Sequence, residues 1–207
     1  MPFDLWLTFV AASTALLLIP GPTVLLVLSY ALSQGRRVAL ATVAGVALGD
    51  LIAMTASLAG LGALVLASAT LFTALKWIGA LYLIWLGIGL IRGARDTRLD
   101  LPEDASGRGV FGHAATVTAL NPKSIVFFIA YVPQFVRPDA ALLPQFAILI
   151  ATFVTLAALN ALAYALLADR LRQRFLRGAL VAWMARLGGA VLVAMGVATL
   201  FLRRGPA

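Results

Sequence analysis

The residues best placed to do chemistry in this chain are polar or helix-breaking residues inside long apolar stretches. A proline cannot continue the hydrogen-bond ladder of a helix, so each break frees backbone carbonyls for other partners. In lipid such breaks are tolerated only where protein or a water-filled cavity covers them, and paired breaks point to a transport site near the midplane. The substrate-binding residues predicted at the breaks are Pro20, Gly21 and Pro22 in the first stretch and Asn121, Pro122 and Lys123 in the fourth.

Asp50 is an acidic residue near the middle of the second apolar stretch. It follows Val38 by 12 residues, which is about 18 Å along a helix and therefore mid-depth in a hydrocarbon core of about 30 Å. An acid at that depth costs about 2.5–3.5 kcal/mol on insertion scales, so function is the default hypothesis. We predict that Asp50 binds substrate and couples transport to protons. A structural ion pair, or a protonated carboxyl bonded to nearby backbone, is the alternative.

Lys123 and Asn160 complete the predicted substrate site. Lys123 follows Gly109 by 14 residues and lies directly after the second break, where amide donors at the start of a new helix favour an anion. Its charge could hold a substrate carboxylate, or it could pair with Asp50. Asn160 occupies the place in the fifth stretch that corresponds to Asp50 in the second, and either contacts substrate or bonds across helices.

Composition identifies the class of protein. The chain of 207 residues is 62% hydrophobic and 12% charged, with a mean hydropathy of +1.01, which is typical of an all-α integral membrane protein. The net charge of +8 does not predict nucleic-acid binding, because most basic residues fall in short loops between apolar stretches. With no cysteine, disulfides and thiolate metal sites are excluded.

Six transmembrane helices account for the apolar stretches, since about 20 residues cross a bilayer core. The loops between spans 1–2, 3–4 and 5–6 hold ten lysines and arginines, whereas the termini and the other loops hold three. This bias places the first set of loops in the cytoplasm. Both termini are then periplasmic, and the first apolar stretch is taken as a retained helix rather than a signal peptide.

The six helices form two repeats within a single transmembrane domain at 1–207. A shift of 110 residues superposes helices 2–3 on helices 5–6 and places Asp50 on Asn160, while a shift of 100 places Pro22 on Pro122. Repeat 1 covers about 1–92, a cytoplasmic loop about 93–108, and repeat 2 about 109–207. Three helices per repeat is an odd number, so the repeats must be inverted, which is a common plan of secondary transporters.

The chain resembles the LysE/RhtB family of amino-acid exporters. The resemblance implies six helices and efflux of amino acids or their derivatives across the bacterial inner membrane, powered by an ion gradient. Members do not all carry an acid at the place of Asp50. The matching stretches are the break at 20–22, GVALGD at 45–50, KWIGALYLIWLG at 76–87, NPKSIVFF at 121–128 and PQF at 133–135.

The leading function is therefore a proton-driven amino-acid exporter that needs no cofactor and no bound metal. A cation or metal-ion exporter is second, although hard cations want several oxygen ligands and Asp50 is the only acid inside a span. A membrane enzyme is third, because the single His113 has no obvious serine partner. The partners expected are the amino acid, protons and the lipid bilayer, and a homo-oligomer is left open.

The predicted topology can be tested with reporter fusions. A reporter fused after Gly107 should be active on the cytoplasmic side, and one fused to the C-terminus should be active in the periplasm, because the basic loops stay inside. If both fusions report the cytoplasm, the topology is wrong.

Overall fold

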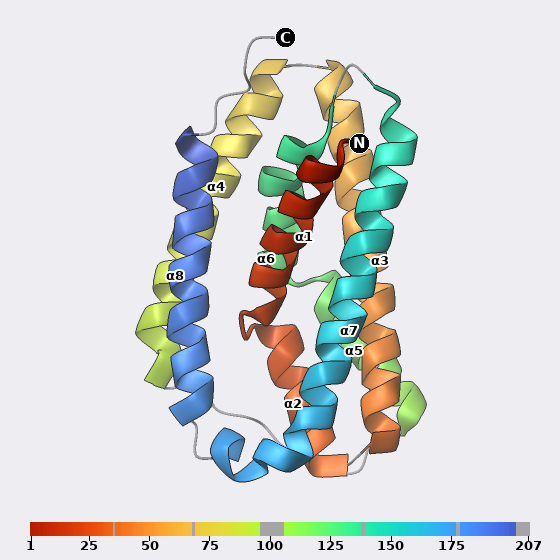
Figure 1. Cartoon of the computed structure of the whole chain (residues 1–207), viewed down its shortest axis with the longest axis vertical. Coiled ribbons are helices and arrows are strands. Elements are labelled where there is room, and N and C mark those ends of the chain that lie inside the picture. Colours follow the sequence, from red (N-terminus) through yellow and green to blue (C-terminus); the bar gives the residue numbers. More distant parts are fainter. Residues whose placement is uncertain (35, 68, 96–105, 138–139, 177–178, 202–207) are drawn as a thin grey trace.

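The structure is a computed structural model that describes residues 1–34, 36–67, 69–95, 106–137, 140–176 and 179–201. Within these ranges every regular element is helical (Figure 1). The elements are α1 (Phe3–Leu18), α2 (Pro22–Gln34), α3 (Arg36–Ala67), α4 (Ala69–Arg92), the 3₁₀ turn η1 (Gly93–Arg95), α5 (Gly107–Ala119), α6 (Pro122–Val126), the π-helical η2 (Phe127–Tyr131), the 3₁₀ turn η3 (Val132–Phe135), α7 (Leu142–Leu176) and α8 (Ala179–Phe201).

The helices form an elongated bundle, and its first and last helices have their outer ends on the same side, as an even number of membrane crossings requires. In Figure 1, α1 begins and α8 ends at one end of the bundle, while α2 ends and α3 begins at the other. The predicted cytoplasmic loop at about 93–108 lies largely outside the described residues, as do Arg203 and Arg204.

Four of the helical segments are long and apolar enough to cross a membrane: Val38–Gly60, Gly107–Phe135, Leu142–Ala168 and Val181–Phe201. The pair α1 and α2, taken together as one bent span, makes a fifth. The apolar part of α4, Trp77–Arg92, is shorter. The chain is therefore a multi-pass helical membrane protein, with four or five candidate spans among the described residues.

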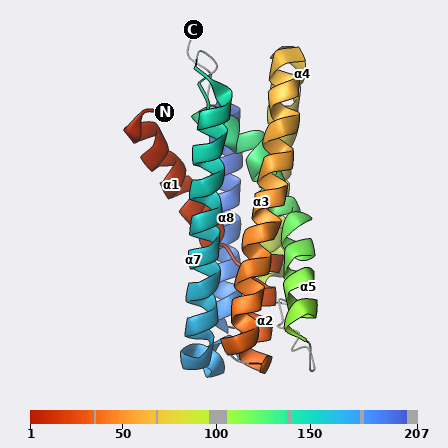
Figure 2. The same cartoon turned by 90° about the vertical axis from the view of Figure 1, so that its right-hand side faces the viewer.

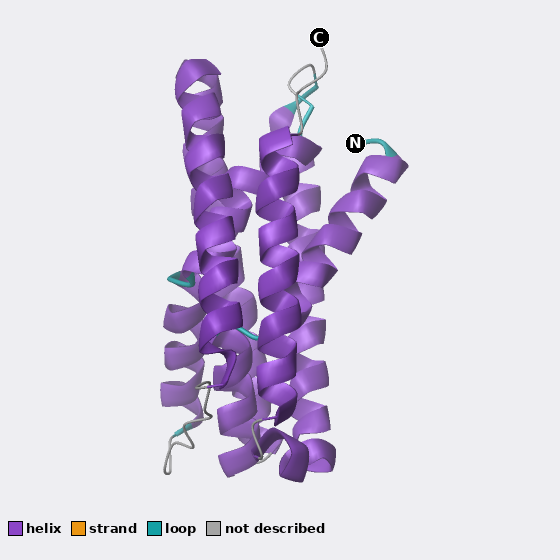
Figure 3. Ribbon diagram, turned by 90° about the vertical axis from the view of Figure 1, so that its left-hand side faces the viewer, coloured by secondary structure: helices purple, strands orange, loops and turns teal. Residues whose placement is uncertain are grey.

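Both predicted breaks are present, and proline chemistry explains each. Ile19, before Pro20, has extended backbone (φ −73°, ψ 121°), and Asn121, before Pro122, is also extended (φ −68°, ψ 110°). A residue before proline disfavours helical backbone, whereas proline fits the first position of the next helix. Consequently α1 and α2 meet at a bend of 57°, and the beginning of α1 leans away from the other helices (Figures 2 and 3).

Small residues hold the long helices close together. A Cβ placed on Gly87 of α4 would lie 2.5 Å from the Gly189 carbonyl oxygen of α8, and the reverse holds for Gly189. Gly45 and Gly49 of α3 face α5 in the same way, because a Cβ added at each would lie 2.4 and 2.6 Å from the backbone oxygens of Phe111 and Ala115. Such close backbone approach is how helices associate in lipid, where no hydrophobic force drives them together.

Aromatic side chains fill the bundle on the side of the breaks towards the beginning of α1. Phe153 of α7 packs against Phe127 and Phe128, with ring centroids 5.9 and 4.8 Å apart. Phe135 joins the cluster to Phe9 of α1 at 5.3 Å. These rings are 4% exposed or less, so they belong to the buried core. The aromatic cluster consists of Phe9, Phe127, Phe128, Tyr131, Phe135 and Phe153.

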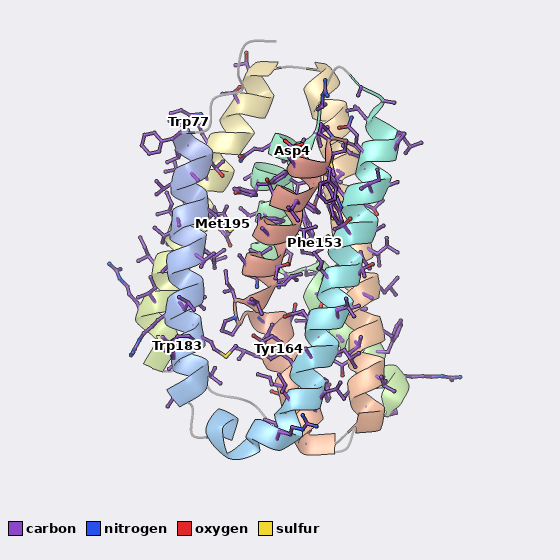
Figure 4. The ribbon with its side chains drawn as sticks, viewed as in Figure 1. Asp4, Trp77, Phe153, Tyr164, Trp183 and Met195 are labelled. Carbon is purple, nitrogen blue, oxygen red and sulfur yellow. The ribbon has the colours of Figure 1, made fainter. Side chains whose placement is uncertain are left out.

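Large apolar side chains on the outside of the bundle are exposed. Trp77 and Trp85 of α4 are 52% and 66% exposed, and Trp183 of α8 is 59% exposed. Figure 4 labels Trp77 and Trp183 at the outer side of the α4 and α8 pair. A soluble domain rarely exposes so many, whereas a lipid-facing surface requires them.

Packing at the glycine contact between α4 and α8 gives a stability prediction. Gly87→Ala should destabilise the protein by about 1–3 kcal/mol, because the new methyl group meets backbone that cannot move aside. Gly89→Ala is the matched control, since a Cβ there meets nothing within 4 Å. Thermal unfolding of both variants in detergent checks this, and equal melting temperatures would contradict it.

Candidate functional site

The first break leaves the end of α1 without its own hydrogen-bond partners. The carbonyls in the last turn of a helix accept no hydrogen bond within the helix, because no helical amide follows them. Here the chain leaves the helix at Ile19, and within α1 only the Leu16 carbonyl receives a closing bond, from the Ile19 amide at 3.2 Å. In a membrane the remaining carbonyls must be satisfied by other parts of the protein.

Three side chains from the second half of the chain cap this helix end. Lys123 Nζ donates to the carbonyl oxygens of Leu16 (3.2 Å) and Ile19 (2.9 Å). Asn160 Nδ2 donates to Leu17 O at 3.0 Å, and Tyr164 OH donates to Leu18 O at 3.1 Å. Every carbonyl from Leu16 to Ile19 therefore has a side-chain donor, and the ammonium of Lys123 lies at the negative end of the α1 dipole. We call these three residues the capping set.

Gly21 makes room for the lysine of the capping set. A Cβ on Gly21 would lie 3.3 Å from both Cε and Nζ of Lys123, which is tighter than most side-chain contacts. The absence of a side chain at this position lets Lys123 reach past the break to the end of α1. Gly21 therefore allows the bend at the first break and also leaves room for Lys123 to cap α1.

At the second break, the free backbone groups are satisfied mainly by residues of the break itself. Asn121 Oδ1 accepts from the Lys123 amide at 3.1 Å and so caps the start of α6. Asn121 Nδ2 donates to Thr23 Oγ1 at 3.1 Å, and Thr23 Oγ1 lies 3.3 Å from Thr118 Oγ1. These hydroxyl and amide contacts bring the start of α2 directly against the second break.

Asp50 faces the breaks from α3 and makes no hydrogen bond within the part of the chain that the structure describes. The side chain is 2% exposed, and its Oδ1 is buried without a hydrogen bond. Lys123 directs its ammonium at α1, and no hydrogen bond or ion pair joins it to Asp50. The direct pair that the sequence left open is therefore not formed. A buried acid without a partner is costly.

A small cavity lies where the two breaks, α3 and α7 meet. The volume of this cavity is about 20 Å³, which is room for about one water molecule. Its wall contains Leu17, Thr23, Val24, Val27, Val46, Asp50, Asn121, Lys123, Ser124, Ala157, Asn160, Ala161 and Tyr164. Figure 4 labels Tyr164 near the level of the first break, with Phe153 of the aromatic cluster closer to the beginning of α1.

The structure brings half of the site residues predicted from the sequence to one cavity. Asp50, Asn121, Lys123 and Asn160 all line the cavity. The remaining four, Pro20, Gly21, Pro22 and Pro122, form the breaks themselves and are not part of the wall.

Thr23 and Ser124 line the cavity but were not predicted. The 100-residue shift that aligns Pro22 with Pro122 also aligns Thr23 with Lys123, so the repeat register contained a signal for Thr23. Ser124 carries no such signal, because a serine in an apolar stretch more often bonds its own helix.

A bundle of membrane-crossing helices with a polar site between two broken helices defines the class of helical membrane transporters. Within that class, the chain belongs to the LysE type translocator family, whose model matches residues 14–203. The family resemblance of the sequence is thereby confirmed, and the family consists of efflux transporters rather than enzymes.

Named relatives cover most of the chain. An uncharacterised membrane protein of Vibrio cholerae is 34% identical over 95% of this chain and 97% of its own length. A homoserine/homoserine lactone efflux protein of Salmonella typhimurium is 38% identical over 83% of this chain and 84% of its own. A leucine efflux protein of Klebsiella pneumoniae is 31% identical over 65% of each. No solved structure matches the chain.

The capping set predicts how Lys123 contributes to stability. Lys123→Met should lower the free energy of unfolding by about 2 kcal/mol or more, because it leaves two buried carbonyls without their lysine donor. Tyr164→Phe, which removes one hydroxyl, should cost about 1 kcal/mol. Melting curves in detergent measure both.

The double variant Asp50→Asn with Lys123→Met distinguishes the cap from an ion pair. Since the two side chains are not bonded to each other, neutralising Asp50 should not restore the stability lost at Lys123. Recovery of the wild-type melting temperature in the double variant would mean that the two charges stabilise each other.

Proposed function

We propose that this protein is a secondary active exporter of amino acids or amino-acid derivatives across the bacterial inner membrane, driven by the proton-motive force. The observation that carries the proposal is the unpartnered carboxyl of Asp50 in a cavity between two broken helices. The efflux relatives support an amino acid or its derivative as cargo.

The proposed architecture is six spans in two inverted repeats within one domain at 1–207. Repeat 1 contains α1 to α4, and repeat 2 contains α5 to α8. Three features support the duplication: each repeat begins with a broken helix, proline opens the second half of each, and α3 and α4 contact their counterparts α7 and α8. The positive-inside rule predicts that both termini are periplasmic, and the position of the start of α1 and the end of α8 at the same end of the bundle supports this.

Competition at Asp50 explains how a proton gradient could drive export. Among the described residues, Oδ1 of this carboxylate accepts no hydrogen bond, so it can bind either a proton or the ammonium of an amino acid, but not both. A site that must exchange one for the other moves them in opposite directions. Protons entering the cell would thus drive substrate out.

The small cavity implies that transport requires a change of shape. Room for about one water cannot hold an amino acid, so the helices must separate to admit one. We propose alternating access around this site. The aromatic cluster closes the path towards the beginning of α1, and the aliphatic residues of α2, α5 and α7 close the opposite path.

The described residues give no support to the two alternative functions, a metal-ion exporter and a membrane enzyme. Within the described ranges, no three His, Cys, Asp or Glu residues come together in a way that could hold a metal ion. His113, considered for an enzyme, lies 2.9 Å from the hydroxyl of Tyr30 through Nδ1. A homo-oligomer stays a prediction.

The test is export by purified protein in liposomes under an imposed pH gradient. Asp50→Asn should abolish gradient-driven transport, at least about a hundredfold if the carboxyl is the obligatory proton carrier, while the protein stays folded and inserted. Asp4→Asn is the matched control, because Asp4 lies exposed in the first turn of α1 and should leave transport unchanged. Normal transport with normal pH dependence in Asp50→Asn would reduce Asp50 to a structural role.

A further inference from the structure

The repeat register relates one bond of the capping set to two residues at the second break. The shift of 110 residues places the donor, Asn160 of α7, on Asp50 of α3. The shift of 100 residues places the acceptor, Leu17 of α1, on Val117 of α5. Building on the proposed function, we infer that the protonated carboxyl of Asp50 donates to the carbonyl oxygen of Val117 and caps the end of α5, as Asn160 caps the end of α1.

The carbonyl of Val117 lacks a hydrogen bond, as the carbonyl of Leu17 would without Asn160. In a continuous helix it would accept from the amide four residues later, but the Asn121 amide donates to Thr118 O at 3.1 Å instead. The next amide cannot replace it, because residue 122 is proline. No other donor to Val117 O is found in the ranges that the structure describes. A carbonyl at this depth in a membrane requires one.

The packing of α3 against α5 brings Asp50 to the end of α5 (Figure 2). A Cβ on the preceding residue, Gly49, would lie 2.6 Å from Ala115 O and 2.7 Å from Thr118 Cβ. Asp50 itself lines the cavity together with Asn121, which follows the end of α5. Its Oδ1 is buried and makes no hydrogen bond to another described residue. A proton on this carboxyl would supply the bond that both groups lack.

The next position of the cap shows that the backbone compensates where α3 has no donor. Tyr164 of α7, which caps Leu18, corresponds to Met54 of α3, and methionine has no hydrogen to donate. Leu18 corresponds to Thr118, and the carbonyl of Thr118 is the one that accepts from the Asn121 amide. The backbone thus supplies a bond opposite Met54. It supplies none at the carbonyl that corresponds to the acceptor of Asn160.

The bond depends on a proton, and in this respect Asp50 differs from Asn160. An amide donates at any pH, whereas a carboxyl donates only when it is protonated. Ionised Asp50 would place a negative oxygen near a carbonyl oxygen, and the two would repel each other. A bound substrate ammonium removes this repulsion, because it can donate to both oxygens. Close packing of α5 on α3 is therefore favoured by a proton or by cargo, and an empty, ionised site opposes it.

The other ionisable groups near Asp50 make bonds of their own. Lys123 of α6 and Tyr164 of α7 line the same cavity, and both donate to carbonyls of α1. His113 lies one turn before Val117 in α5, and its Nδ1 is 2.9 Å from the hydroxyl of Tyr30 of α2. A pH response of α5 that disappears when Asp50 is replaced by asparagine is therefore assigned to Asp50.

Hydrogen–deuterium exchange of the full-length protein in nanodiscs tests the bond. Asp50→Asn carries a permanent donor, and Asp50→Leu is similar in size but has none. At a single pH, peptides from α5 should exchange about tenfold faster in Asp50→Leu, because a lost buried hydrogen bond eases local opening by roughly that factor. The last turn of α1 is the internal control, since Asn160 caps it in both variants. Asp4→Asn and Asp4→Leu, at an exposed position, should leave α5 unchanged.

A pH series on the wild-type protein tests the same bond without a change of side chain. Protection of α5, corrected for the intrinsic effect of pH on exchange, should fall as pH rises and should stay constant in Asp50→Asn. Equal protection of α5 in the Asn and Leu variants overturns the inference, and so does a wild-type protection that does not change with pH. If Asp50→Asn has also lost export, the proposed function stands without the cap. Normal export by Asp50→Asn overturns the proposed function and this inference with it. The pH series decides even if Asp50→Leu does not fold.

Discussion

The end of α1 is the constraint on which the rest of the site depends. A helix that stops in the middle of a membrane presents carbonyls that cannot be left bare. Lys123, Asn160 and Tyr164 supply the donors, and each must come within about 3 Å of its carbonyl. That requirement fixes the start of α6 and the middle of α7 against α1. The cavity is the space left between helices held in this way.

The free backbone groups at the two breaks find their hydrogen-bond partners differently, and this difference determines where the charge of Lys123 lies. At the second break, the amides of Leu120 and Asn121 bond to Thr116 and Thr118, and Asn121 caps the next helix itself. The first break depends on donors from elsewhere, one of which is a cation. Because the ammonium of Lys123 donates to α1, it makes no direct hydrogen bond to Asp50. A structural need at one helix end thus leaves a carboxyl oxygen without a hydrogen bond at the cavity.

The sequence predicted where the helices break but not where the polar side chains at the breaks point. Proline chemistry located both breaks, because it depends only on local sequence. The partners of Lys123 could not be predicted, since its two carbonyls lie 104 and 107 residues earlier in the chain. Their similar depth made Asp50 a candidate ion-pair partner of Lys123. Hydropathy, however, does not predict towards which neighbouring helix a side chain points.

The aromatic cluster escaped prediction for a related reason. Its rings come from α1, α7, the π-helical η2 and the 3₁₀ turn η3. Nothing in the local pattern of an apolar stretch separates a core phenylalanine from a lipid-facing one. The glycine contacts have a local signal, because small residues four apart on α3 indicate close packing. Which helix they would meet required the fold.

The capping set also has a consequence for biosynthesis. The donors for the end of α1 follow it by 104 to 146 residues, so they are translated later by several seconds to about half a minute at ribosomal rates of roughly 5–20 residues per second. Throughout that interval the first helix has carbonyls that its own half of the protein does not satisfy. The nascent chain must therefore keep that turn near water or within the insertion machinery until α7 arrives. Truncations that end before Tyr164 should leave the first helix a poor membrane anchor, although it is the first to be made.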